Sequence, residues 1–289
     1  MSTRLPIVCG VDTSSEAATA AHVAGRLAAL LDRPLAVVHV APKPWVSERP
    51  FGDYPERLEQ QASFDRAGYL RTVLAPLELP EPPHVDRIVE WSTVPDDALR
   101  AVAERLAAEL IVIGSRGQSP LEDMLVPGST STGLARDAPV PVVLTPSAMV
   151  GANVALPGGA LACGVDGSEL SIAAARTTGR LAEGLGVPLV LVNVESESDE
   201  ALDGEKVAAS VVEAAPGVEL REERSRGPVA EELVAACARH GAGLIAVGSR
   251  GRGAFKSALL GSVTAGLLRS SDRPVLVVSR SAAKSDVPA

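Results

Sequence analysis

Residues 110–117, LIVIGSRG, and residues 244–251, LIAVGSRG, are the two stretches that decide the fold of this chain. Each starts with four apolar residues, which is typical of a strand buried on both faces of a parallel sheet. Each ends in Gly-Ser-Arg-Gly, and glycines directly after an apolar run predict a turn. Because the two stretches differ at only two positions, they indicate that one α/β unit occurs twice.

The repeat extends over most of the chain. Residues 7–14, IVCGVDTS, match residues 161–168, LACGVDGS, at a shift of 154 positions, and the shift falls to 134 at the stretches quoted above. The first copy therefore has 20 extra residues, which lie within residues 41–93, a segment rich in proline and aromatic residues. These residues either form a partner-binding surface or pack over the sheet.

The boundary between the copies is expected near residues 145–159. This segment contains three glycines and two prolines, a composition that predicts a linker. The two domains are accordingly assigned to residues 1–147 and 158–282.

Each copy alternates apolar runs of strand length with stretches of helical length. Strands are expected at residues 5–11, 35–41, 84–91, 109–114 and 140–145, and at residues 160–165, 188–195, 217–224, 243–248 and 273–279. Helices are expected at residues 15–31, 95–108 and 129–137, and at residues 170–184, 229–240 and 262–270. This order predicts an α/β fold of two tandem Rossmann-like domains, each a five-stranded parallel sheet flanked by helices. Such sheets bind ligands at the carboxyl ends of their strands.

Composition excludes several classes of partner. The formal net charge is −9, and an acidic surface repels nucleic acid. No apolar run is long enough to cross a membrane, and the first residues lack the layout of a signal peptide. Cys9, Cys163 and Cys237 are too few for a disulfide framework and are expected to be small buried residues, so a cytoplasmic location is expected.

An aspartate follows the first strand of each copy, at Asp12 and Asp166. The side chain there either caps the following helix or forms the turn before it, or else it contacts a ligand, and a structural role alone is the commoner one. Ser14 and Ser168 could cap as well. The glycine run after the fourth strand is more specific. In the second copy Gly248 and Gly251 are followed, after nine residues, by Gly261 and Ser262. Backbone N–H groups of such a loop, and of the helix that Ser262 opens, favour a phosphate. Arg250 and Arg252 either add positive charge there or simply face solvent.

This pattern resembles the universal stress protein family in its tandem two-domain form, and the resemblance covers nearly the whole chain. It implies a fold like that of the adenine nucleotide alpha hydrolases, and ATP as the ligand, with or without Mg²⁺. In this family the aspartate lies beside the adenine and the glycine loop encloses the phosphates. The implied binding residues of the second copy are Asp166, Gly248, Arg250, Gly251, Gly261, Ser262 and Val263. The turn at Gly227–Pro228 is expected to border the adenosine.

The first copy departs from the pattern. Its counterparts are Asp12, Gly114, Gly117, Gly128 and Ser129. Ten residues instead of nine separate Gly117 from Gly128, and Pro127 lacks an N–H group. Thr93–Val94 stands where the second copy has Gly227–Pro228. Nucleotide binding by the first copy is therefore left open.

No catalytic constellation is evident. The histidines have no metal-ligand spacing, and His39 is interpreted as a core histidine with its hydrogen bonds satisfied. The leading hypothesis is an ATP-binding, non-enzymatic regulator of the stress response. The alternatives are an interaction module without nucleotide and a slow nucleotide hydrolase. Gly261→Glu is predicted to abolish binding by the second copy.

The last strand of each copy is strongly apolar, at residues 140–144 and 275–278, and an apolar edge strand invites pairing. The family resemblance implies that these strands pair within the chain as a pseudo-dimer. A homodimer through the final strands is also expected.

Overall fold

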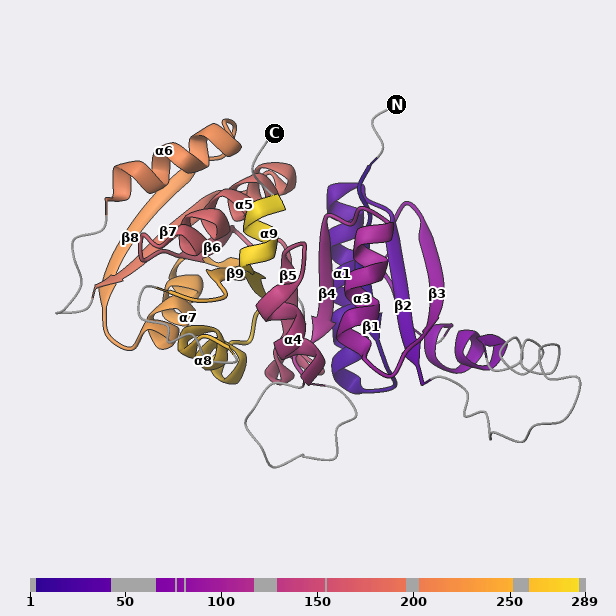
Figure 1. Cartoon of the computed structure of the whole chain (residues 1–289). Helices are drawn as coiled ribbons and strands as arrows, with labels where there is room; N and C mark the ends of the chain where they lie inside the picture. Colours follow the sequence, from indigo (N-terminus) through magenta and orange to yellow (C-terminus); the bar gives the residue numbers. More distant parts are fainter. Residues whose placement is uncertain are drawn as a thin grey trace, which may run out of the picture.

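The computed structural model describes residues 4–42, 66–75, 77–80, 82–116, 129–153, 155–195, 203–251 and 260–285. Figure 1 shows two α/β domains side by side, with the N-terminal domain in indigo and magenta and the C-terminal one in orange and yellow. Domain 1 contains β1 (Ile7–Val11), α1 (Ser15–Leu31), β2 (Leu35–Ala41), η1 (Leu70–Leu74), β3 (Val85–Trp91), α3 (Pro95–Arg105), β4 (Leu110–Gly114), α4 (Ser129–Asp137), β5 (Val142–Thr145) and η2 (Ser147–Met149). Domain 2 contains β6 (Ala160–Gly164), α5 (Glu169–Leu185), β7 (Leu189–Glu195), α6 (Gly204–Ala214), β8 (Leu220–Arg226), α7 (Val229–His240), β9 (Ala242–Gly248), α8 (Ser262–Ser270), β10 (Val275–Val278) and α9 (Arg280–Ser285).

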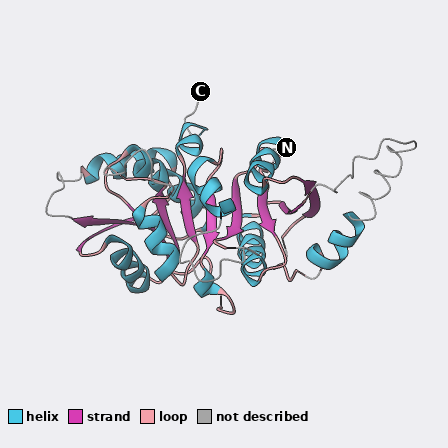
Figure 2. Cartoon of the chain, turned by 60° about the horizontal axis from the view of Figure 1, so that its bottom comes forward, coloured by secondary structure: helices cyan, strands magenta, loops and turns pink. Residues whose placement is uncertain are grey.

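All ten strands join one sheet in the order β3-β2-β1-β4-β5-β10-β9-β6-β7-β8. The strands within each domain are parallel, and the two domains meet where β5 and β10 pair antiparallel, with Leu276 opposite Val143. Figure 2 shows the strands as a central layer with helices on both sides. One apolar core lies on each face, and each core contains residues of both domains. The predicted α/β class and the pairing of the final strands within the chain are thus confirmed.

The pairing also corrects an expectation. β5 is hydrogen-bonded to β4 and β10, and β10 to β9 and β5. Both edges of each final strand are therefore occupied, and a homodimer cannot form through these strands unless the sheet opens.

The first helix of each domain is fixed by local chemistry. Ser14 caps α1 by accepting a hydrogen bond from Ala17 N, and Ser168 caps α5 by accepting one from Ser171 N. The helices end at residues in the left-handed conformation, which are Asp32 with φ 54° and Gly186 with φ 66°. Both helices are 17 residues long, so the duplicated sequence places the strands that follow at equivalent points.

Several predicted boundaries differ from the structure by one or two residues, and two differ by three. β8 begins at Leu220 instead of 217, because residues 216–217 form a turn in which Val218 N donates to Ala215 O at 3.2 Å. α3 ends at Arg105 instead of 108, because Ala107 has φ 49°, and a left-handed residue ends an α-helix.

Candidate functional site

A cavity of about 570 Å³ lies at the carboxyl ends of the strands of domain 1. Residues after β1 and β4 form its floor, among them Asp12, Thr13, Gly114 and Arg116, and the first turn of α4 forms one wall, including Ser129. β1 and β4 are neighbours in the sheet although they are far apart in the sequence. The cavity therefore lies where the strand order reverses, the position at which doubly wound sheets bind ligands.

The two ends of the cavity differ in chemistry. Arg116 and the first residues of α4, Ser129–Ser131, form the end beside β4. A helix N-terminus has unpaired N–H groups and a positive partial charge, so this end favours an anion. His39, Tyr69 and Val73 form the end beside β2, which favours a flat, mostly apolar group.

Asp12 and Asp166 both build the turn before a helix. Asp12 Oδ1 accepts hydrogen bonds from Ser14 N at 2.9 Å and Ser14 Oγ at 2.5 Å. Asp166 Oδ1 makes the same pair with Ser168, at 2.9 and 2.6 Å. One carboxylate oxygen in each domain thus holds the capping serine in place, so the aspartates form the turn while Ser14 and Ser168 cap the helices.

The loop after β9 meets this aspartate in domain 2. A Cβ atom on Gly251 would lie 2.5 Å from Asp166 Oδ2, so the absence of a side chain lets the loop approach the carboxylate. A Cβ on Gly261 would lie 2.8 Å from Ser249 O. Four of the predicted residues, Asp166, Gly251, Gly261 and the Ser262 that opens α8, are consequently gathered at one end of the sheet.

Packing alone explains part of the glycine pattern. A Cβ on Gly248 would lie 2.9 Å from the backbone carbon of Leu170, and a Cβ on Gly114 would lie 3.0 Å from Glu16 Cβ. These two glycines let the strand ends pass close to α5 and α1. Their presence therefore supports the fold whether or not a ligand binds.

The predicted residues Gly117 and Gly128 lie outside the described part of the chain. Ser129 begins α4, and Val263 is the second residue of α8. Arg250 follows the buried Ser249 in the loop after β9.

The first turns of α4 and α8 are anchored differently. Ser131 Oγ donates to Ser115 O at 2.8 Å and so ties α4 to the loop after β4. Thr264 occupies the equivalent place in α8, but its buried hydroxyl has no hydrogen-bond partner within the described residues. The two helix ends that face the sites are thus not held by the same contact.

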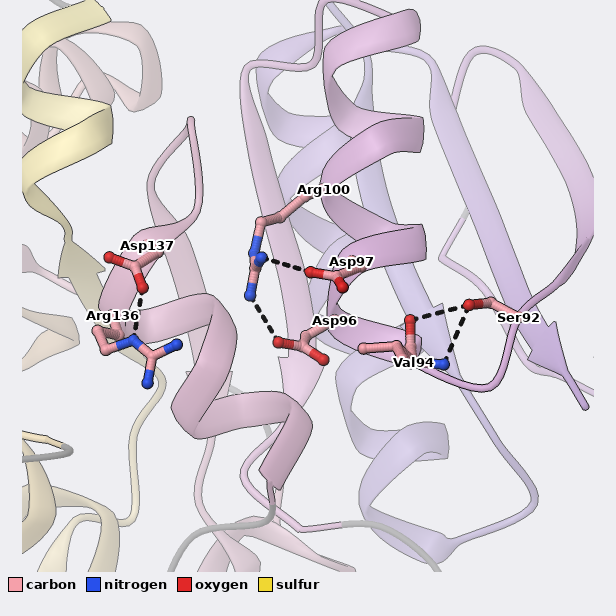
Figure 3. A network of polar contacts seen from close by, with 7 residues as sticks. All are labelled: Ser92, Val94, Asp96, Asp97, Arg100, Arg136 and Asp137. Atoms are coloured by element: carbon pink, nitrogen blue, oxygen red, sulfur yellow. Dashed lines mark hydrogen bonds and ion pairs between the residues drawn. The ribbon is translucent and has the colours of Figure 1, made fainter.

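A polar network supports the α3 side of the cavity (Figure 3). Arg100 pairs with Asp96 and Asp97, each at 2.6 Å. Ser92 Oγ accepts from Val94 N at 3.0 Å and closes the turn into α3. α3 in turn contributes Pro95 and Leu99 to the cavity lining.

Domain 2 closes the equivalent turn with backbone geometry instead. Gly227 has φ 143°, which L side chains rarely adopt, and Pro228 occupies the N-cap position of α7 without a side-chain hydrogen bond. The difference between Thr93–Val94 and Gly227–Pro228 is therefore a change in how the turn is built.

Most residues that line the cavity are not among the predicted site residues, and His39 and Tyr69 are two of them. The sequence predicts His39 as a satisfied core histidine, and its Nδ1 does lie 2.9 Å from Val11 O; it also lines the cavity. Tyr69 belongs to the segment that is longer in domain 1. Residues 66–75 of that segment bring Tyr69 and Val73 to the cavity, and Leu74 is fully buried. For these residues, packing over the sheet is the interpretation that holds.

The cysteines are free and buried, as expected. Burial raises the pKa of the Cys163 thiol and of the Cys237 thiol to about 12 in each case, and it raises the pKa of Cys9 further. Within the described ranges, no group of three His, Cys, Asp or Glu residues is arranged to hold a metal ion. None of the helices described is long and apolar enough to cross a membrane.

Comparison with known proteins settles the family. The universal stress protein family matches residues 4–146 and 160–279. The chain belongs to this family. A universal stress protein of Mycolicibacterium smegmatis is 30% identical over 294 residues, which is 96% of this chain and 97% of that protein. One from Mycobacterium tuberculosis H37Rv is 30% identical over 295 residues, covering 95% and 97% respectively.

A solved structure shares the whole two-domain arrangement. The crystal structure of a universal stress protein from Archaeoglobus fulgidus aligns with a TM-score of 0.61 at 21% identity, covering 95% of this chain and 98% of that one. This likeness concerns the fold.

Proposed function

We propose that this universal stress protein binds ATP at the carboxyl ends of the strands and acts as a regulator in the stress response. The nucleotide is held in domain 2 by the glycine loop after β9, and in domain 1 by the cavity described above. The observation that carries the proposal is this cavity of about 570 Å³, which lies within the roughly 300–1,000 Å³ range of small-molecule sites.

The residues present fit the chemistry of a nucleotide. Arg116 and the first turn of α4 form the anion-binding end in domain 1, and Arg250 with Gly261, Ser262 and Val263 form it in domain 2. The missing side chains of Gly251 and Gly261 let the domain-2 loop lie close against Asp166 Oδ2 and Ser249 O. When bound, ATP would supply a charged polyphosphate, which these groups would hold and orient, with or without Mg²⁺.

A regulatory role is preferred to an enzymatic one. Asp12 and Asp166, the acidic residues that the family resemblance places beside the nucleotide, each use one carboxylate oxygen to hold a capping serine. A general base must lie within hydrogen-bond reach of an attacking water. Because one carboxylate oxygen of each aspartate already holds a serine, these aspartates are poor candidates for that role. The alternatives are an interaction module without nucleotide and a slow hydrolase.

Retained nucleotide is the first test. The chain has only two tryptophans and two tyrosines, so bound nucleotide visibly raises the ratio of absorbance at 260 nm to that at 280 nm. Denaturing the purified protein and separating the supernatant by ion-exchange chromatography identifies the nucleotide. The absence of both retained nucleotide and calorimetric binding of ATP, ADP, AMP and cAMP would rule out the proposal and leave the interaction module.

A negative charge placed at the anion-binding end is the second test. Gly261→Glu is a poor probe, because any side chain there also presses on Ser249 O. Ser262 is exposed at the first position of α8, where a glutamate suits the helix dipole but repels phosphate. Ser262→Glu is expected to weaken ATP binding by domain 2 at least about tenfold. Ala101→Glu, on an exposed position of α3, is the charge-matched control and should bind like the parent protein.

Hydrolysis is tested with the same variant. Release of phosphate from ATP that is lost in Ser262→Glu but kept in Ala101→Glu would favour the slow hydrolase. We expect the parent protein to release no more phosphate than Ser262→Glu does.

A further inference from the structure

His39 is held in one orientation at the apolar end of the domain-1 cavity. Its side chain is only 8% exposed, and its ring lies 4.7 Å from that of Tyr69, tilted by 39°. Tyr69 meets Trp91 edge-on at 6.0 Å. The cavity-lining imidazole is thus fixed by a hydrogen bond on one side and an aromatic neighbour on the other.

The hydrogen bond of His39 also sets its tautomer. Val11 O can only accept, so Nδ1, at 2.9 Å, must carry the proton. In the neutral ring, Nε2 is then an acceptor. No donor among the described residues is hydrogen-bonded to Nε2. A ligand in the cavity could supply one, because His39 lines the cavity.

Domain 2 repeats this contact with a different side chain. Asn193 occupies the equivalent position on β7, and its Nδ2 donates to Val165 O at the same distance of 2.9 Å. The amide oxygen of Asn193 is then its remaining acceptor. In both domains, one side-chain donor therefore binds the carbonyl at the end of the first strand, and the same side chain retains one acceptor.

We propose that His39 determines which base the domain-1 site accepts, with Nε2 receiving a hydrogen bond from the amino group of a 6-aminopurine and Tyr69 packing beside the base. This inference rests on the proposed function and assigns the preference for adenine over purines with a 6-oxo group to one side chain. A 6-oxo group would place one acceptor against another, and a site built to bond a donor rejects a ligand that lacks it. The base lies at the β2 end of the cavity and the phosphates at the α4 end.

The experiment compares ATP with inosine triphosphate, which differs at this position of the purine. Calorimetry is done on the full chain carrying Ser262→Glu, so that domain 2 does not contribute. The protein with His39 should bind ATP at least about tenfold more tightly than inosine triphosphate. His39→Phe keeps a ring but removes the acceptor, and it should bring the two affinities to within about twofold. His39→Asn copies domain 2 and should restore the preference.

The outcomes separate the two proposals. Equal affinities for ATP and inosine triphosphate in the protein with His39 would overturn this inference without any further variant. A preference that survives in His39→Phe, with the thermal midpoint showing that the variant is folded, would overturn it as well. Failure of the parent chain to bind any nucleotide would instead overturn the proposed function.

Discussion

Gly248 ends β9 at the point where α5 begins, and its Cα faces the backbone of Leu170. We predict that Gly248→Ala destabilises the protein by about 1–3 kcal/mol, because the added methyl meets main-chain atoms at 2.9 Å that cannot swing away. Gly68 is the matched control: it lies in a helical segment, and a Cβ atom there would have no neighbour within 4 Å. Gly68→Ala should be neutral or stabilising by up to about 1 kcal/mol. Urea denaturation measures both; equal effects would show that the close approach at Gly248 is not a constraint.

The cysteine thiols are predicted to be inert in the folded protein. With a pKa of about 12 for Cys163 and for Cys237, about one thiol in ten thousand is ionised at pH 8, and the thiolate is the reactive form. Ellman's reagent should therefore titrate all three cysteines only after denaturation. Rapid reaction of a thiol in the native protein would contradict the burial described here.

A polar tie joins β8 to α7. Glu223 accepts hydrogen bonds from Arg239 and from His240, the latter at 2.6 Å. Burial raises the pKa of Glu223, but the hydrogen bonds from Arg239 and His240 outweigh it and lower the pKa below its ordinary value of 4.5. The side chain is only 17% exposed, so Glu223 belongs to the packed contact between β8 and α7.

The pH dependence of this tie follows from the direction of the shift. A carboxylate whose pKa is lowered by folding stabilises the protein above its unfolded pKa, and this contribution disappears as the pH falls through the folded value. Glu223→Gln should thus lower the urea midpoint at pH 7, and the gap to the parent protein should close as the pH falls below about 4.5. Glu222→Gln, at the exposed neighbouring position, is the control. A gap that persists unchanged at pH 3 would assign the effect to packing instead of charge.

Elements with local signals could be predicted from the sequence, and those without could not. The predicted bounds of α1, α4, α7 and α8 agree with the structure to the residue, because a serine, glycine or proline marks their starts. The predicted start of β8 is wrong because Val218 looks like a strand residue although it follows a Pro-Gly turn. The single-turn η1 carries no periodic pattern, so its delivery of Tyr69 to the cavity depends on tertiary packing.

The same distinction holds for the site. The motif residues Asp166, Gly251 and Gly261 can be recognised in the sequence because their spacing is distinctive. His39 cannot be recognised as a site residue there because a lone histidine in a strand carries no motif, and only the fold places it beside Val11 O.

At the scale of the whole molecule, the two domains are one sheet joined at β5 and β10. Ser279, which follows β10, reinforces this junction: its buried hydroxyl donates to Ala138 O of domain 1 at 2.6 Å and accepts from Ala282 N at 3.0 Å. The segments that follow the two final strands cross to the other domain, where α9 contacts α4 and η2 contacts α8. Each helix that faces a proposed anion-binding end is thereby packed against the opposite domain.

We predict that Ser279→Ala destabilises the chain by about 1–2 kcal/mol, since a buried carbonyl and a helix cap both lose a partner. Ser285→Ala, at an exposed position of the same helix α9, should change stability by less than about 0.5 kcal/mol. Thermal unfolding measures the difference, and equal midpoints for the two variants would show that Ser279 does not stabilise the junction.

The stoichiometry of ATP binding tests the central claim most directly, namely that each domain offers a nucleotide site at the carboxyl ends of its strands. Calorimetry with the parent protein should give two ATP per chain. Ser129→Glu and Ser262→Glu, equivalent exposed positions at the starts of α4 and α8, should each remove one, and the double variant should remove both. No binding by the parent protein, or binding that the double variant leaves intact, would contradict the account.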